Sequence, residues 1–451
     1  MSWETVIGLE THVQLSTKTK LFSRASTAFG ESPNTNVNLV DCGLPGVLPS
    51  VNKEAFYKAI RFGMAVGAKI NQTSIFDRKN YFYADLPKGY QITQMDLPIV
   101  LGGSIEITSD NSVKTINITR AHLEEDAGKS IHDQFDGYSA IDLNRAGTPL
   151  LEIVSEPEIS NAKEAVAYMK AMHQLVTYLD VSDGNMAQGS LRCDANVSIR
   201  KKGASKLGTR AEIKNINSFK FIEKAINYEV KRQIKILESG EKVVQETRLY
   251  DSAKDETRPM RSKEFANDYR YFPEPDLLPV VISDQEMKEI KDNFPELPKD
   301  KEVRYEKDFK LSSYDSKILA SSKSMADFFE DAAEKTKNFS LLANWMIGEI
   351  SAFLNKDVIE IHESQLTPNN IAMLINRIDD QTISGKIGKS IFEEMCSTGE
   401  SPDQIIESQG LRQLSDDGEI EKLINAVIED NAKQVAAYLD GKEKLFGFFV
   451  G

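Results

Sequence analysis

A change in hydrophobic periodicity near residue 290 constrains the fold more than any other feature of this sequence. Before it, short segments of alternating apolar and polar residues are separated by turns that contain glycine and proline. After the segment 271–276, which holds two prolines, helical patterns take over. Alternation is typical of half-buried strands, and a 3.6-residue period is typical of helices. The sequence therefore predicts an α+β domain at 1–293 and an all-helical region from 294 onward.

Several segments carry the apolar spacing and capping residues of helices. In the first part they are 53–67, 161–179 with Asn161 as N-cap, and 219–238 followed by Gly240; later they are 325–335, 339–354, 403–407 and 417–438. We find no internal repeat.

Charge and composition exclude several classes of protein. The net charge of -14 argues against a broad basic surface for nucleic acid, so any RNA would bind through local patches such as 200–210 and 258–270. Ordinary solvated loops also explain these patches. The N-terminus has no basic segment followed by an apolar run, and no run of about 18 apolar residues occurs. The three cysteines are far apart, which predicts no disulfide framework and fits a cytoplasmic protein without membrane contact.

The first candidate site lies in 9–15. If this segment is a strand, Glu10, His12 and Gln14 share one face and Val13 and Leu15 the other. A carboxylate and an imidazole two residues apart suit a divalent cation, although Mg²⁺ prefers oxygen ligands. A plain solvent-facing surface is the alternative.

A carboxylate inside an apolar run marks the second candidate. Glu152 interrupts the segment 150–154, and burial of a carboxylate without a partner would cost several kcal/mol. A salt bridge to nearby Arg145 is one explanation, and a bound cation is another. With Glu124, Glu125 and Asp126 the acidic groups are numerous enough to hold Mg²⁺ beside ATP phosphates.

The clearest strand is 190–200, in which apolar residues alternate with Arg192, Asp194 and Asn196. A face with these three side chains can clamp a phosphate or carboxylate and orient metal-bound water. An outward solvated face is the alternative. The segment 77–90 combines cations and aromatic residues around Pro87 and Gly89, which predicts a shaped loop rather than a regular element.

Seven ordered segments together resemble the B subunit of the bacterial and organellar Asp/Glu-tRNA amidotransferase, over essentially the whole chain. They are GLETHVQL at 8–15, DRKNYFYADLPKGYQITQ at 77–94, HLEEDAGK at 122–129, LNRAGTPLLEIVSEPE at 143–158, GSLRCDANVSIR at 189–200, EIKNINSF at 212–219 and DYRYFPEPDL at 268–277.

The resemblance implies a cradle-like kinase domain around a mainly antiparallel sheet at 1–293. A helical domain at 294–400 and a small helical tail similar to YqeY-type proteins at 401–451, which contacts tRNA, would follow. The family's Gly-Phe-x-Val-Gly segment normally runs on into a further helix. We therefore expect this chain, which stops at Gly451, to be incomplete at the C-terminus.

The implied reaction is a ligase reaction in translation. ATP, with Mg²⁺, phosphorylates the side-chain carboxylate of Glu on tRNA(Gln), of Asp on tRNA(Asn), or of both. Ammonia from the partner amidase, which is the A subunit, then attacks the acyl phosphate, and a small C subunit completes the heterotrimer. The resulting products are Gln-tRNA(Gln) and Asn-tRNA(Asn).

The resemblance also assigns roles to matching residues. His12, Glu125 and Glu152 look like the Mg²⁺ ligands, with Glu10 and Glu124 as the nearest alternates. The residues expected in catalysis are Glu125, Glu152, Lys79, Lys88 and Asp194, and those expected to bind ATP are Glu10, Arg192 and Asn196. Lys79, Lys88 and Asp194 would line the mouth of an ammonia channel, with Tyr81 and Thr148 as weaker candidates.

One departure from the family concerns zinc. Many relatives carry a zinc knuckle in the early region, but the matching positions here are Ser23, Ala25, Asn38 and Asp41, and Cys42 is one place off. We therefore predict no zinc. Two other functions fit the residues alone. They are a self-contained ATP-dependent ligase for a small molecule and a non-catalytic tRNA-binding protein.

Overall fold

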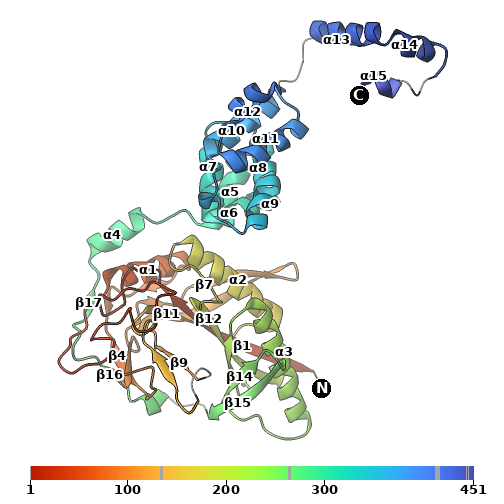
Figure 1. The fold of residues 1–451 in the computed structure, drawn as a ribbon. Coiled ribbons are helices and arrows are strands. Elements are labelled where there is room, and N and C mark those ends of the chain that lie inside the picture. Colours follow the sequence, from red (N-terminus) through yellow and green to blue (C-terminus); the bar gives the residue numbers. More distant parts are fainter. Residues whose placement is uncertain are drawn as a thin grey trace. The chain divides into compact units, whose positions relative to one another are not determined.

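The computed structural model describes residues 2–132, 136–262, 266–411, 417–442, 444 and 446–450. The chain divides into two compact units, Met1–Pro295 and Glu296–Gly451 (Figure 1). Lys263 of the basic segment 258–270 and residues 412–416 of the predicted tail lie outside the described residues.

A large mixed sheet forms the framework of the first unit. Its main path runs β15-β14-β13-β12-β1-β11-β8-β5-β4-β16. The four central strands are β12 (Leu191–Lys201), β1 (Trp3–Gln14), β11 (Pro149–Ser155) and β8 (Ser112–Glu125). Each is antiparallel to its neighbour. The C-terminal ends of β1 and β8 therefore lie beside the N-terminal ends of β11 and β12, at the same end of the sheet.

Shorter strands complete the unit. They are β2 (Lys69–Ile70), β3 (Thr73–Ser74), β4 (Asp77–Asn80), β5 (Tyr90–Thr93), β6 (Val100–Leu101), β7 (Ser104–Ser109), β9 (Lys129–Ile131), β10 (Ala140–Asp142), β13 (Ala211–Ile216), β14 (Glu246–Asp251), β15 (Glu256–Ser262), β16 (Phe272–Pro273) and β17 (Val280–Val281). The pair β13 and β14 is parallel.

The two faces of the central strands differ as the alternation predicts. On β1, Ile7, Leu9 and Val13 are fully buried. On the same face, Thr11 contacts Met169 of α2, with 3.3 Å between Oγ1 and Sδ. Helix α3 packs on β12, where Gln233 donates a hydrogen bond to the Val197 carbonyl. The polar side chains consequently gather on the opposite face.

The three helices predicted for this unit are confirmed. They are α1 (Lys53–Ala65), α2 (Ala162–Tyr178) and α3 (Phe219–Glu238), and α4 (Asp284–Asp292) follows them. The Asn161 side chain caps α2 by accepting from the Glu164 N–H, which satisfies a donor that the first helical turn leaves free.

The prediction of an irregular loop at 77–90 was wrong at its beginning. Residues 77–80 form β4, which pairs with β5 and with β16 from almost 200 residues later. Arg78 holds β16 in place through a bidentate pair with Glu274, with N···O distances of 2.7 and 2.8 Å. Patterns of neighbouring residues cannot reveal a strand partner that lies so far away in the sequence.

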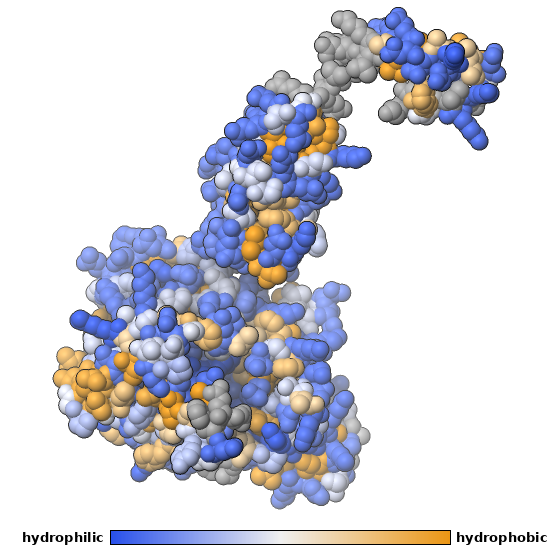
Figure 2. Space-filling view, in the orientation of Figure 1, coloured by the Kyte–Doolittle hydropathy of each residue, from blue (hydrophilic) through white to orange (hydrophobic). Residues whose placement is uncertain are grey.

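The second unit is helical. Its helices are α5 (Pro298–Asp308), α6 (Ser313–Ala320), α7 (Lys323–Ala333), α8 (Phe339–Trp345), α9 (Ser351–Asp357), α10 (Pro368–Asp379), α11 (Gly385–Thr398), α12 (Pro402–Gln409), α13 (Asp417–Asp430), α14 (Ala432–Leu439) and α15 (Phe446–Val450). A core of aliphatic and aromatic residues, among them Tyr305 and Phe329, lies within it. Hydrophilic residues cover much of its surface in Figure 2.

Two predicted long helices are interrupted. The segment 339–354 contains a π-helical turn, Met346–Ile350, between α8 and α9, where the Ser351 hydroxyl donates to the Met346 carbonyl. The segment 417–438 breaks at Asn431, which separates α13 from α14. Apolar periodicity continues through both breaks, so the pattern concealed them. None of the helices in the described ranges has the length and apolar content needed to cross a membrane.

Candidate active site

Strand register assembles a row of polar residues across the central sheet. His12 of β1 is paired with Glu152 of β11 on one side and with Arg192 of β12 on the other. Glu152 is in turn paired with His122 of β8. Four residues from distant parts of the chain therefore stand side by side on the polar face.

Three side chains in and beside this row form a compact group that could hold a cation. The ligand atoms of His12, Glu124 and Glu152 lie within 4.8 Å of one another. A Glu152 oxygen is 3.6 Å from Nε2 of His12 and 3.5 Å from Nε2 of His122. The buried Nδ1 atom of His122 has no hydrogen-bond partner among the described residues. Two carboxylates and an imidazole are a reasonable donor set for a divalent cation.

Glu125, which the resemblance associated with the metal, lies elsewhere. It forms an ion pair with Lys88 and accepts a hydrogen bond from the Ile92 N–H at 2.9 Å. Consecutive residues of a strand point to opposite faces, so Glu124 and Glu125 of β8 cannot both join one group. The structure brings Glu124 to His12 and Glu152.

Neighbouring charges favour the carboxylate form of Glu152. Burial raises the pKa of Glu152, but the charge of His122 and the adjacent His12 outweigh burial and hold the pKa well below its usual value. Burial lowers the pKa of Lys79, but the negative charges of Glu124 and Glu152 outweigh it and raise the pKa. Lys79 therefore carries a positive charge near these carboxylates.

A second acidic group lies on the same face. Glu10, Asp194 and Glu212 approach one another closely, and Asn196 donates to Glu10 at 2.8 Å. Lys214 forms an ion pair with Asp194 and lies 3.4 Å from Glu212. Burial and the charge of Glu152 raise the pKa of Glu10. Lys214 partly neutralises this group, which makes it a weaker cation site than the first.

Arg145 does not pair with Glu152, contrary to one interpretation of the sequence. Its Nε atom is 3.7 Å from Asp126, and the Arg192 guanidinium donates to the same carboxylate at 2.9 Å. Burial raises the pKa of Asp126, but the two arginines outweigh burial and lower it. Asp126 is thereby held by arginines rather than placed in the metal group.

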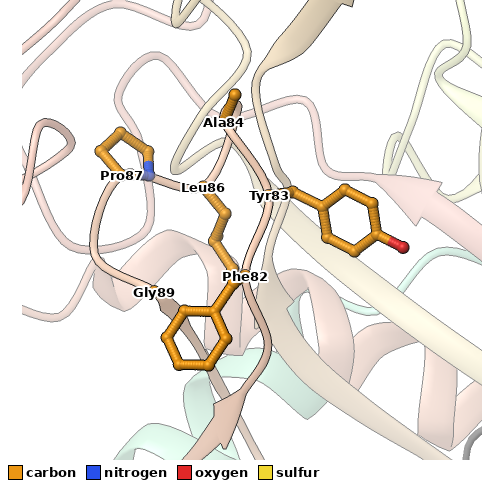
Figure 3. A pocket seen from close by; sticks show the side chains of 6 residues that line it. All are labelled: Phe82, Tyr83, Ala84, Leu86, Pro87 and Gly89. Carbon is orange, nitrogen blue, oxygen red and sulfur yellow. The ribbon is translucent and has the colours of Figure 1, made fainter.

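The remaining predicted residues lie around the site. Tyr81 contributes a ring 5.8 Å from the Lys79 ammonium. Thr148 is buried and its carbonyl accepts from the Asp126 N–H at 2.9 Å. The loop after β4 forms an open pocket of about 440 Å³ lined by Phe82, Tyr83, Ala84, Leu86, Pro87 and Gly89 (Figure 3). None of these six residues carries a charged side chain.

At the positions compared with a zinc knuckle, the structure has a buried ion pair. Asp41 accepts from Lys20 at 3.0 Å and from the Ser23 hydroxyl at 3.2 Å. Lys20 also donates to the Leu143 carbonyl at 3.2 Å. Burial lowers the pKa of Lys20. This ion pair ties the segment 20–41 to the loop that precedes β11.

Sequence reasoning missed His122, Lys214 and Glu212 as members of the site. His122 stands two residues before Glu124, so the alternation of apolar and polar residues in 121–124 was an available signal. Lys214 and Glu212 belong to β13, whose pairing with β12 brings them to the polar face.

Comparisons with known proteins agree with this architecture. A family model described as the GatB/GatE catalytic domain matches residues 5–288, and one described as the GatB domain matches residues 327–451. The chain is 59% identical over 452 residues to the B subunit of the aspartyl/glutamyl-tRNA(Asn/Gln) amidotransferase of Hydrogenovibrio crunogenus. It is 58% identical over 456 residues to proteins of the same name from Ectopseudomonas mendocina and Pseudomonas aeruginosa. Each match covers 100% of this chain and 95% of the relative.

Proposed function

The chain belongs to the B-subunit family of the Asp/Glu-tRNA(Asn/Gln) amidotransferases, and from this premise we propose that it activates the side-chain carboxylate of Glu-tRNA(Gln), Asp-tRNA(Asn) or both with ATP. The carboxylate oxygen attacks the γ-phosphorus, and the bond from that phosphorus to the ADP oxygen breaks. Ammonia then attacks the carbonyl carbon of the acyl phosphate and inorganic phosphate leaves. The product is the amide, Gln-tRNA(Gln) or Asn-tRNA(Asn).

The observation that carries this proposal is the group His12, Glu124 and Glu152, whose ligand atoms lie within 4.8 Å of one another. The depressed pKa of Glu152 keeps it a carboxylate, which is the form that binds a cation. These donors fit Mg²⁺, with water in the remaining positions. When bound, Mg²⁺ would offset the negative charge of the phosphate oxygens.

The chain's own cations supply the rest of the electrostatic environment. Lys79 stays protonated near Glu124 and Glu152, so it can stabilise negative charge that develops on the transferred phosphoryl group. Asn196 positions Glu10 through a hydrogen bond of 2.8 Å. Arg192, at the edge of the row, can hold an anionic group by charge-assisted hydrogen bonds.

We further propose that ammonia reaches this face from the amidase, the A subunit of a heterotrimer whose third member is a small C subunit. The family name supports an assembly of several subunits. Lys79, Lys88 and Asp194 are the polar groups proposed for the channel mouth. A cradle-like kinase fold for 1–293, a helical domain at 294–400, a tRNA-contacting tail at 401–451 and a cytoplasmic location, without zinc, belong to the same proposal.

The decisive experiment measures γ-phosphate release from ATP by the assembled complex, with and without mischarged tRNA. We expect release to require Glu-tRNA(Gln) or Asp-tRNA(Asn) and to be lost in Glu152→Gln. The matched control is Glu156→Gln, because Glu156 follows the same strand and its carboxylate accepts, among the described residues, only from the Thr119 hydroxyl, at 2.7 Å. Release that is indifferent to both tRNA and Glu152→Gln would contradict the proposal.

The same experiment distinguishes the two rival functions. Turnover on free glutamate or aspartate without tRNA would favour a small-molecule ligase. A non-catalytic tRNA-binding role predicts full activity of the complex with Glu152→Gln.

A further inference from the structure

Beside the row of metal-binding candidates, two arginines share one carboxylate. Oδ2 of Asp126 accepts from Gln14 at 2.8 Å and from Nη2 of Arg192 at 2.9 Å, and Nε of Arg145 lies 3.7 Å away. One negative charge therefore faces two guanidinium groups. The charges of Glu124 and of Asp194, which is also paired with Lys214, act on Arg192 as well, but among the described residues neither carboxylate forms an ion pair or hydrogen bond with either arginine.

Both guanidinium groups keep donors available. Of the three guanidinium nitrogens of Arg192, only Nη2 has a hydrogen-bond partner among the described residues. Arg145 uses Nε and Nη2 on the carbonyl oxygens of Ala127 and Gly128, at 2.9 and 2.6 Å. These carbonyl bonds fix the plane of the Arg145 guanidinium. The side chains of Arg192 and Arg145 are 30% and 36% exposed, so a ligand can reach them.

The sheet explains why these residues meet. Gln14 is the last residue of β1, and Asp126 directly follows the end of β8. Arg145 lies shortly before the start of β11, and Arg192 is the second residue of β12. All four strand ends lie at the same end of the sheet because neighbouring strands are antiparallel. Arg192 is also the register partner of His12. The arginine pair thus borders the group His12, Glu124 and Glu152.

We propose that Arg145 and Arg192 form a clamp for a phosphate group of the nucleotide, with Asp126 holding the two arginines in place until the phosphate binds. This inference rests on the proposed function, which supplies the nucleotide. A guanidinium matches a phosphate through parallel N–H···O bonds, and two cations close to an anion in a partly desolvated site bind it more strongly than either alone. Asp126 competes with the ligand for the same donors.

Because of this competition, substitutions of the arginines and of Asp126 should change ADP affinity in opposite directions. Arg145→Gln and Arg192→Gln each remove a donor and should weaken ADP binding by about tenfold or more. Asp126→Asn removes the competing charge while its amide oxygen still accepts hydrogen bonds, so ADP should bind several-fold more tightly. A purely structural salt bridge would give weaker or unchanged binding in all three variants.

The test is equilibrium binding of ADP in the presence of Mg²⁺ to the assembled complex, with thermal unfolding to confirm folding. Arg200→Gln is the matched control. Arg200 lies roughly 26 Å along the same strand and is paired with Glu4; its substitution should leave ADP binding unchanged. Tripolyphosphate, but not glutamate, should displace ADP from the wild type and should compete less well in Arg145→Gln.

Each outcome separates the clamp from the proposed function. Wild-type binding of ADP with unchanged affinity in Arg145→Gln would overturn the clamp and leave the nucleotide reaction intact. Weaker binding in Asp126→Asn would also overturn it. Displacement by glutamate but not by tripolyphosphate would assign the arginines to a carboxylate instead. Absence of nucleotide binding by the wild type would contradict the proposed function itself.

Discussion

The carboxylates of Glu330 in the helical unit and Glu152 in the sheet unit are both surrounded by cationic side chains, but their partners differ in geometry. Glu330 accepts from Arg304 at 2.8 Å, from Tyr305 at 2.6 Å and from Lys301. Glu152 has His12 and His122 at 3.6 and 3.5 Å, which is longer than a normal hydrogen bond. Three protein donors converge on Oε1 of the first carboxylate. The second keeps capacity for a ligand.

This difference predicts where each carboxylate contributes. A charged group with several short hydrogen bonds mainly stabilises the fold, and its loss leaves the partners unsatisfied. A charged group with open coordination serves a ligand at some cost in stability. Substitutions in the two clusters should therefore affect different measurements.

The largest effect should come from Glu124→Gln in the sheet unit. We expect activity of the complex to fall on the order of 10²–10³-fold, because a group that offsets charge in the reaction is lost, while the thermal unfolding midpoint changes little. The Mg²⁺ concentration required for half-maximal activity should rise. Glu125→Gln is the comparison, because it breaks the ion pair with Lys88 and should leave the Mg²⁺ requirement unchanged. The reverse order would show that Glu125 is the ligand.

Glu330→Gln should have the next largest effect, on stability. Three donors lose a charged acceptor, so the free energy of unfolding of the helical unit should fall by about 2–3 kcal/mol. Denaturant unfolding followed by circular dichroism measures the loss. Glu349→Gln is the control, because Glu349 makes an exposed pair with Lys389 worth less than about 1 kcal/mol. An unstable Glu349→Gln with an unaffected Glu330→Gln would refute the assignment.

The pH dependence of stability should differ between Glu330→Gln and the wild type. Burial raises the pKa of Glu330, but the hydrogen bonds from Lys301, Tyr305 and Arg304 outweigh it, and the folded pKa lies below 4.5. The stabilisation is therefore present above pH 4.5 and is lost as the pH falls through the folded pKa. Unfolding measured between pH 6 and 3 should show a shallower decline for Glu330→Gln than for the wild type. Equal slopes would contradict this.

The smallest effects concern helix caps and check that the two units can be perturbed separately. Asn161 caps α2 in the sheet unit, and Ser384 caps α11 in the helical unit by accepting from the Ile387 N–H. Replacing either by Ala should cost about 1 kcal/mol. Hydrogen exchange should register each loss in its own unit. Equal loss of protection in both units would mean that they unfold together.

Local chemistry made part of this fold predictable. The caps and apolar stripes located α1, α2 and α3, and alternation located β1 and β12, because these signals depend on neighbours in the chain. Strand partners do not. The phase of β8, which selects Glu124 over Glu125, follows from its register with β11. The pairing of Arg145 with Asp126 depends on the chain between β10 and β11, which brings Arg145 back to the end of β8.

The candidate residues were named more readily than their groupings. Glu152 stood out as a carboxylate in an apolar run, and His12 and Arg192 stood out by alternation. Their relation to one another required four strands in register. For His122 the alternation in 121–124 was the available signal, and a single histidine in such a segment is not distinctive by itself.

The central position of β1 has a consequence for synthesis of the protein. Strand β1 leaves the ribosome before both of its partners, β11 and β12, and Glu10 pairs with Val154 and Asp194. At about 5–20 residues per second, roughly 7–30 s pass before the first partner is made and longer before the second. During that time β1 has two unpaired edges. Premature release of the chain before about residue 200 would free a strand prone to aggregation, which makes this stretch of translation the interval in which a chaperone has most to protect.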